Sequence, residues 1–164
     1  MELSNLGIRQ NSLKFGKIVT MPSMAFKDWL GLSPAIVKKL RSDFDYIRLG
    51  RDGIRRSEID HLGSMMGVSR KVLAEDIFDV SVKTIERKNS TARIDPRISS
   101  QAIEIAKVLQ HGYEVFGDKD KLIAWIHREN RALNGQPPIQ LFSTLTGLSL
   151  VNDILGRIQE GVYT

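Results

Sequence analysis

Basic side chains that could contact nucleic acid lie between Ser69 and Arg93. An Asp79-Val80-Ser81 turn is followed by Val82-Lys83-Thr84-Ile85-Glu86-Arg87-Lys88, and a helix over this stretch would expose its Lys and Arg side chains. Ammonium and guanidinium groups bind phosphate oxygens and the acceptor atoms of guanine, and a Thr hydroxyl can bind either. The stretch therefore predicts a helix that contacts DNA.

Eight residues form this predicted DNA-contacting surface, on or beside the turn. They are Arg70, Lys71, Ser81, Lys83, Thr84, Arg87, Lys88 and Arg93. Arg70, Lys71 and Arg93 are expected to contact the phosphate backbone. Glu75, Asp76 and Glu86 would repel phosphate unless they point away, so an ordinary helical hairpin with a solvated basic face is the alternative.

A helix-turn-helix between Ser69 and Lys88 would position these side chains. Ala74 is small where two helices must cross closely, and the apolar residues around it can form their shared core: Leu73, Ile77, Val80 and Ile85. Asp79 stands where a turn glycine is usual, and Asp tolerates a positive φ. Since the second helix of this motif enters the major groove, residues 82–88 are the expected recognition helix.

Composition excludes several other classes of function. The chain has 164 residues, 41% of them hydrophobic and 26% charged, which suits globular domains rather than disorder. The absence of cysteine excludes disulfides, thiolate zinc sites and a cysteine nucleophile. The net charge is +5, and the whole excess lies before Pro96, because basic and acidic residues balance from there on. The charge thus indicates an anionic partner for the first part of the chain.

We expect no catalytic site, no metal and no cofactor. Segment 112–119 is only faintly similar to a phosphate-binding loop, because Asp118 precedes Lys119 and no Ser or Thr follows. The histidines are too far apart in sequence for a helical zinc site and are interpreted as surface residues: His61, His111 and His127. Neither a signal peptide nor a stretch of the ~20 apolar residues that cross a bilayer is recognised, which predicts a cytoplasmic protein without membrane contact.

Apolar residues recur three and four positions apart along most of the chain, which predicts an all-α fold. A turn-tolerant residue, an apolar residue and a Ser recur together, and each group is expected to end one helix and cap the next: Gly31-Leu32-Ser33, Gly67-Val68-Ser69, Asp79-Val80-Ser81 and Gly147-Leu148-Ser149. A helix is also expected from Pro34, with its apolar side formed by Ile36, Val37, Leu40 and Phe44.

Three segments are predicted along the chain. Residues 1–52 form an N-terminal extension with one or two helices, in which residues 1–22 are an arm or short strand. Residues 53–94 form the helix-turn-helix region, and residues 95–164 form a helical domain. Residues 89–96 are the candidate linker, which ends in Asp95 as a helix cap. Beyond it, a long helix carries one apolar seam: Ile98, Ala102, Ile105, Leu109, Gly112 and Phe116.

The last 51 or so positions carry a longer pattern, spread over three stretches. It reads Glu114-Val115-Phe116-Gly117-Asp118, then Trp125-Ile126, then Asn130-x-x-Leu133-x-Gly135-x-x-Pro138-x-x-Leu141-x-x-Thr144-x-x-Gly147-x-x-x-Val151-x-x-x-Leu155-x-Arg157-Ile158-x-x-Gly161. This pattern resembles the toxin-binding domain of the Xre/MbcA/ParS antitoxins, and most closely the Xre antitoxins that pair with RES-domain toxins. With the helix-turn-helix included, the resemblance extends over residues 53–164.

The resemblance implies an antitoxin of a type II toxin–antitoxin module. Such a protein binds a cognate RES-domain toxin, an NAD-consuming enzyme, and blocks its active site. It also forms a homodimer and represses its own operon by binding operator DNA. Residues 95–164 would then serve toxin binding and dimerisation, after an N-terminal helix-turn-helix region. The rival interpretations are a helix-turn-helix regulator without a toxin partner and a helical interaction module with no role on DNA.

The end of the final helix and the tail after it are the toxin-binding residues that the resemblance implies. They are Arg157, Glu160, Gly161, Val162, Tyr163 and Thr164. A frayed chain end is the alternative. Most other pattern positions are expected to be structural, with Gly135 and Gly147 at sharp changes of direction and Pro138 at a helix start.

Overall fold

The computed structural model describes residues 24–162, so the arm expected at residues 1–22 and the tail residues Tyr163 and Thr164 lie outside the described part. Within it the fold is all-α, as predicted, with one isolated β-bridge between Arg55 and Arg93. The elements are α1 (Phe26–Leu30), α2 (Pro34–Val37), α3 (Asp43–Asp52), α4 (Arg56–Met66), α5 (Arg70–Val72), the π-helical η1 (Leu73–Ile77), α6 (Val82–Glu86), α7 (Pro96–Phe116), α8 (Lys119–His127), the 3-10 helices η2 (Arg131–Leu133) and η3 (Pro138–Ser143), and α9 (Leu145–Gln159). None of these helices is long and apolar enough to cross a bilayer.

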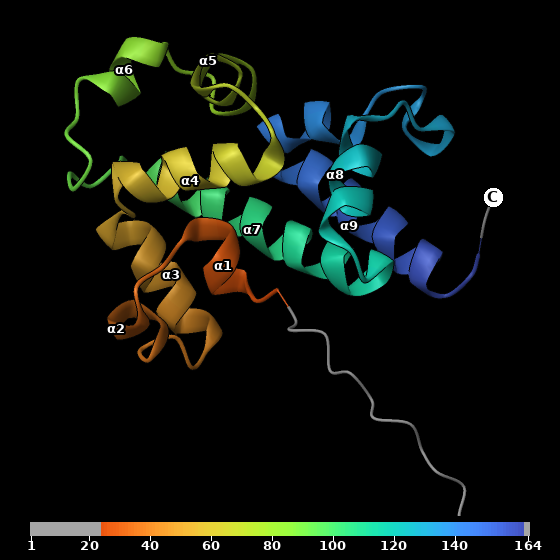
Figure 1. The fold of residues 1–164 in the computed structure, drawn as a ribbon, viewed down its shortest axis with the longest axis horizontal. Coiled ribbons are helices and arrows are strands. Elements are labelled where there is room, and N and C mark those ends of the chain that lie inside the picture. The colour runs from red at the N-terminus through yellow and green to blue at the C-terminus, as the bar shows by residue number, and fades with distance from the viewer. Residues whose placement is uncertain (1–23, 163–164) are drawn as a thin grey trace, which may run out of the picture.

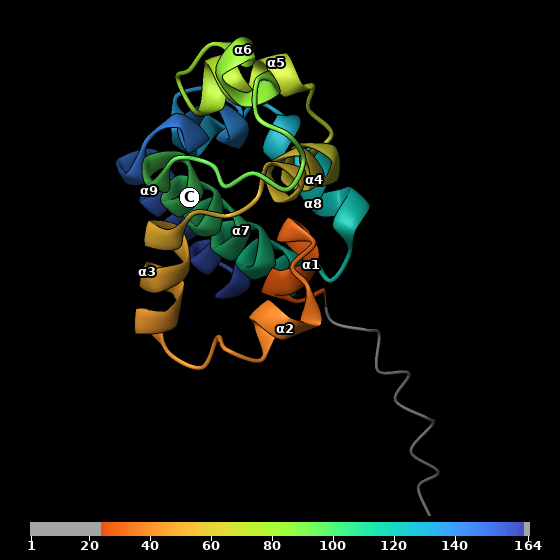
Figure 2. The same cartoon turned by 90° about the vertical axis from the view of Figure 1, so that its left-hand side faces the viewer.

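Helix α7 lies at the centre of the molecule (Figures 1 and 2). The helices α1, α3 and α4, which precede it in the sequence, pack on it, and so do α8 and α9, which follow it. The predicted seam is confirmed, because five of its residues are buried and Phe116 is half-buried. Gly112 lets α8 approach closely: a Cβ at this position would lie 2.5 Å from Leu122 Cδ1. Asp95 caps α7 as predicted, accepting a hydrogen bond from Arg97 N.

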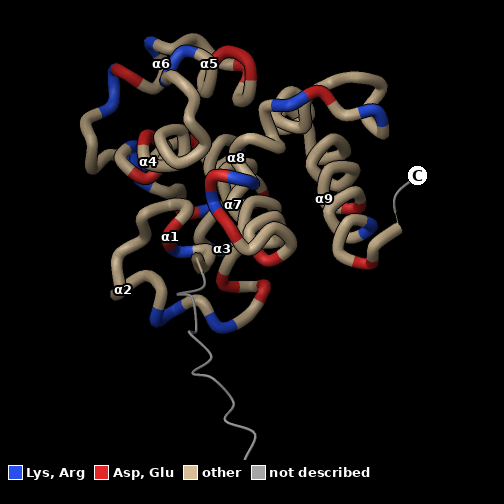
Figure 3. Tube along the Cα trace, turned by 45° about the vertical axis from the view of Figure 1, so that its right-hand side comes forward, with Lys and Arg blue, Asp and Glu red and all other residues tan. Residues whose placement is uncertain are grey.

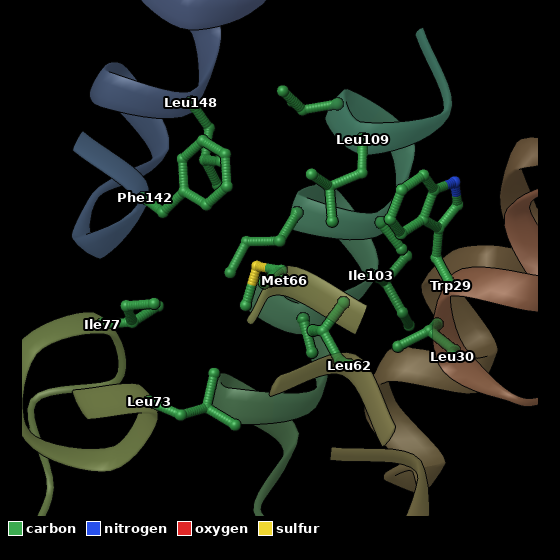
Figure 4. Close-up of a cluster of buried hydrophobic side chains, with 14 of the residues drawn as sticks. Trp29, Leu30, Leu62, Met66, Leu73, Ile77, Ile103, Leu109, Phe142 and Leu148 are labelled. Carbon is green, nitrogen blue, oxygen red and sulfur yellow. The ribbon is translucent and has the colours of Figure 1, made fainter. Parts of the chain in front are cut away.

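The hydrophobic core is continuous across the predicted segment boundary at residue 94. Figure 4 shows side chains from α1, α4, η1, α7, η3 and α9 meeting in one cluster, which includes Trp29, Leu30, Leu62, Met66, Leu73, Ile77, Ile103, Leu109, Phe142 and Leu148. Each large apolar side chain that is buried stabilises a fold by about 1.5–3 kcal/mol. The helices before and after α7 therefore stabilise one another.

Three of the four expected cap sequences are confirmed in position, and among their three serines Ser69 alone accepts a capping hydrogen bond with its side chain, from Val72 N. Gly31 (φ 61°), Gly67 (φ 71°) and Asp79 (φ 53°) adopt the left-handed conformation, and the Ser two positions after each is the N-cap of α2, α5 or α6. At Asp79, the sequence argument for a residue with positive φ is therefore correct.

The fourth cap sequence, Gly147-Leu148-Ser149, was interpreted wrongly. Gly147 lies inside the first turn of α9, whose cap is Thr144: the Thr144 hydroxyl accepts a 3.0 Å hydrogen bond from Gly147 N. Gly147 therefore makes no change of direction. A Cβ there would lie 2.1 Å from the Leu141 carbonyl oxygen, so glycine is needed where η3 passes against α9.

The single helix expected from Pro34 is also wrong, because the chain forms two helices there. Helix α2 ends at Val37, and α3 begins after the Ser42 N-cap. The Asp45 carboxylate accepts hydrogen bonds from the backbone N–H groups of Arg41 and Ser42, at 3.0 and 2.9 Å. The bond from Arg41 N is the main reason that the pKa of Asp45 is below its usual value. Because a new helix begins at Asp43, the side chain of Phe44 is exposed.

The candidate linker is paired with the start of α4. Ile94 N donates to Ile54 O at 2.8 Å, and Arg56 N donates to Ala92 O at 2.9 Å. The buried Ser99 hydroxyl on α7 accepts a hydrogen bond from Ile54 N and donates one to Ile94 O. Ser99 of α7 therefore binds both ends of the segment 54–94. These bonds hold the segment against the rest of the fold.

Candidate functional site

A backbone hydrogen bond and buried side chains join η1 to α6 across the turn at Asp79. Val80 N donates to Ala74 O at 2.9 Å, and Ala74 and Ile85 are fully buried between the two helices. Phe78 N reaches back five residues to Leu73 O, 3.0 Å away, which makes η1 a π-helix. The outer side of α6 is thereby turned away from the core.

Three cations on and after α6 are exposed and have no acidic partner among the described residues: Lys83, Arg87 and Lys88. Figure 3 shows basic segments at α6, at the edge of the molecule. Ser81 and Thr84 lie beside them, with their hydroxyl oxygens 3.0 Å apart. These five predicted residues therefore share one surface, which we call the α6 surface.

Arg70 is placed differently from these cations. Its Nε donates to Asp60 Oδ1 at 2.8 Å, and its Nη1 lies 3.8 Å from Glu86 Oε1. The hydrogen bond that Arg70 donates to Asp60 is the main cause that raises the pKa of Arg70 above its usual value. Because Arg70 holds Glu86 toward α4, it reduces the repulsion that this carboxylate would exert on a phosphate beside α6.

The last two predicted DNA contacts also have intramolecular partners. Lys71 Nζ lies 4.0 Å from Glu75 Oε2, one turn along the helix. The Arg93 guanidinium donates to the carbonyl oxygens of Asp52 and Gly53, at the start of the helix-turn-helix region. Arg93 therefore helps to close that region, a role that the sequence did not indicate.

A second exposed surface lies at the end of α9. Gly161 has φ 71°, and Val162 N donates to Arg157 O at 2.9 Å, so the chain turns back after the helix. The described members of the predicted toxin-binding set are all exposed: Arg157, Glu160, Gly161 and Val162. Side chains of opposite charge and one apolar side chain thus stand together at this helix end.

Helix α9 is held on α7 by a histidine that sequence reasoning missed. His111 Nδ1 lies 2.8 Å from Asn152 Oδ1, and His111 Nε2 lies 3.3 Å from Gln159 Oε1. The other histidines also join separate elements, since His61 Nε2 is 2.9 Å from Asp28 O and His127 Nε2 is 2.8 Å from Met66 O. All of these partners are more than 30 residues away in sequence, so no local signal could have identified them.

A buried glutamine connects η1 to η3. Gln101 Nε2 donates to Ile77 O at the end of η1 and to Phe142 O in η3, each at 2.8 Å. Its amide thus satisfies one carbonyl oxygen at the end of η1 and one in η3, shortly before α9 begins. The sequence placed Gln101 only on α7 and gave it no role.

No group of three or more His, Asp or Glu side chains that could hold a metal ion occurs within residues 24–162.

Comparison with known proteins gives a family match that includes most of the second surface. Residues 111–161 match the family described as the antitoxin Xre/MbcA/ParS C-terminal toxin-binding domain. An Antitoxin Xre of Yersinia enterocolitica is 30% identical over 79 residues, which are 48% of this chain and 53% of that protein. An Antitoxin Xre of Photorhabdus laumondii is 32% identical over 67 residues, 40% of this chain and 45% of that protein.

A longer alignment covers most of the chain. The Prs ADP-ribosylating antitoxin of a Sphingobium species is 26% identical over 145 residues, which are 81% of this chain and 91% of that protein. With the Xre relatives, by contrast, the chain aligns over only about half of their length.

Proposed function

We propose that this protein is the antitoxin of a type II toxin–antitoxin module, from the premise that its residues 111–161 match the Xre/MbcA/ParS toxin-binding domain. The observation that carries the proposal is the match of residues 111–161 to a toxin-binding domain. The partner would be a RES-domain toxin that consumes NAD, which the antitoxin would neutralise by blocking its active site.

The end of α9 would make the neutralising contact. Arg157 and Glu160 are exposed there, and the His111 contacts to Asn152 and Gln159 hold the helix on α7. A helix end that is fixed before binding loses less conformational entropy on binding than a flexible one. Residues 161–164 would extend from this end into the toxin cleft.

The α6 surface would bind operator DNA and so repress the operon. Lys83, Arg87 and Lys88 are free to pair with phosphates or guanine, while Ser81 and Thr84 offer hydroxyl groups beside them. Arg70 would keep Glu86 away from the DNA, and Lys71 and Arg93 would contribute at the edges. This arrangement favours the antitoxin that regulates itself over a module with no role on DNA.

Co-expression with the neighbouring gene tests the proposal directly. A tagged chain should retain the toxin in a pull-down, and cells that express the toxin should keep their NAD only when the chain is present. If the adjacent gene product neither binds the chain nor lowers NAD, the rival interpretation holds: a helix-turn-helix regulator without a toxin partner.

A further inference from the structure

A groove of about 580 Å³ lies outside both candidate surfaces, between α2 and α3, and we call it the α2–α3 groove. Three of its lining side chains are apolar and half-buried: Ile36, Leu40 and Leu49. The other lining residues are all charged: Lys38, Lys39, Arg41, Asp45, Arg48, Asp52 and Arg93. Five of these seven charges are positive, so the groove suits an anionic occupant.

The groove forms because the chain ends one helix and starts another here. Asp45 accepts hydrogen bonds from the backbone N–H groups of Arg41 and Ser42, which starts α3 and leaves residues 38–41 between the two helices. This short segment contains three cations and no acidic residue, and all three cations are exposed. Within residues 24–162 none of them forms an ion pair, so their charges are available to a partner.

The carboxylates of the groove do not cancel this charge. Asp45 is paired with Arg48, so these two charges neutralise each other. Arg93 donates its hydrogen bonds through Nη1 to the carbonyl oxygens of Asp52 and Gly53. Because these oxygens carry no net charge, Arg93 keeps its positive charge. Four cations of the groove therefore remain against one carboxylate, that of Asp52.

The groove continues the predicted DNA-contacting surface. Arg93 belongs to that surface and also lines the groove. Figure 1 shows α6, the segment that follows it, α3 and α2 one after another down one edge of the molecule, and Figure 2, in which this edge faces the viewer, shows the same order. Figure 3 marks basic segments both at α6 and directly after α2. A polyanion that lies on α6 can therefore extend along this edge to the groove.

We propose that the α2–α3 groove binds the phosphate backbone of DNA next to the bases that α6 contacts. A duplex carries one negative charge per about 1.7 Å of its axis, so cations beside a recognition helix can meet several phosphates. Such contacts fix the register of a protein on the duplex and carry no sequence information. The proposal rests on the operator binding proposed above and adds a second contact to it. An acidic protein, by contrast, would make no use of the continuity with α6.

Binding of the full chain to promoter DNA of two lengths tests the proposal. The long duplex is the promoter fragment that the chain protects in footprinting, and the short duplex is the shortest part of it on which Lys83→Ala still lowers affinity. Lys38→Ala with Lys39→Ala should lower affinity for the long duplex by about tenfold and reduce the slope of log affinity against log salt by about 2. On the short duplex this variant should bind as tightly as the unmodified chain, since the flanking phosphates are absent.

Lys121→Ala with Arg128→Ala is the matched control, because it removes the same charge from exposed positions outside the groove. It should bind both duplexes as the unmodified chain does. Circular dichroism checks that each variant stays folded.

Three results would overturn the proposal. The first is equal affinity of the groove variant and the control for the long duplex, and the second is an equal loss on both duplexes. The third is a groove variant that binds DNA normally but no longer binds the toxin, which would make an acidic protein surface the occupant. These results contradict the groove alone, whereas an unmodified chain that binds no promoter fragment would contradict the operator binding itself.

Discussion

Residues 53–94, the predicted helix-turn-helix region, and residues 111–161, which match the toxin-binding family, present their exposed charges in different ways. Near α6, Asp60 and Glu86 are paired to Arg70, while Lys83 and Arg87 have no acidic partner among the described residues. At the end of α9, Arg157 and Glu160 of opposite sign are both exposed. The first surface suits long-range attraction to a polyanion, and the second suits a partner recognised by shape and local pairing.

The largest effect expected from this contrast is on DNA binding. Lys83→Ala with Arg87→Ala should lower operator affinity by about 100-fold or more, because each contact to a base or phosphate contributes roughly 1–3 kcal/mol. A mobility-shift titration over several salt concentrations measures the loss, and the slope of log affinity against log salt should fall by about 2.

A control variant matches this change in charge. Lys121→Ala with Arg128→Ala removes two exposed cations, one on α8 and one directly after it, far from α6 in the sequence, and should leave operator binding unchanged. Equal losses in the two double variants would show that net charge, rather than the α6 surface, attracts the DNA.

The second effect tests the connection between the regions. Gln101→Leu should reduce the free energy of unfolding by about 2–4 kcal/mol, because the carbonyl oxygens of Ile77 and Phe142 would lose a buried donor. Urea titration followed by circular dichroism measures this. Gln110→Leu on the same helix is the control, since Gln110 bonds only the exposed Glu114 and should shift stability by less than about 0.5 kcal/mol. Similar stability of the two variants would contradict the role of Gln101.

The third effect concerns the C-terminal surface alone. Deletion of residues 161–164 should weaken toxin binding by about tenfold or more without loss of folding, because interface residues that fill a cleft each contribute over about 1 kcal/mol. Calorimetry with the toxin, together with growth of toxin-expressing cells, measures this. Operator binding by the same variant should be unchanged. Full rescue by the truncated chain would leave the tail without a role.

The smallest effect is expected for Arg70. Arg70→Ala should lower operator affinity by less than about tenfold, because exposed ion pairs contribute at most about 1 kcal/mol and the guanidinium acts through Glu86. Arg70→Ala combined with Glu86→Gln should restore much of that affinity, as the repelling carboxylate is then gone. If Arg70→Ala is as damaging as Lys83→Ala, Arg70 contacts DNA directly.

Local features of the fold were predictable because short segments decide them. Asp79 takes a positive φ, Asp95 caps α7, and the seam of α7 is buried, as the spacing of these residues indicates. The prediction was wrong where two local signals competed. Between Val37 and Asp43 the hydrogen bonds to Asp45 start a new helix, although the apolar spacing continues through Phe44.

The sequence by itself determined the all-α class, the turn before α6 and the resemblance of the C-terminal pattern, since residue type and spacing along the chain are enough for these. Only the tertiary structure showed that Arg70 and Arg93 bind groups within the chain while Lys83 stays free. The contacts of Gln101 and His111 and the groove between α2 and α3 were likewise visible only in the tertiary structure. The physical reason is that a side chain's charge belongs to its residue, but whether that charge is available to a partner depends on neighbours that folding brings from distant positions.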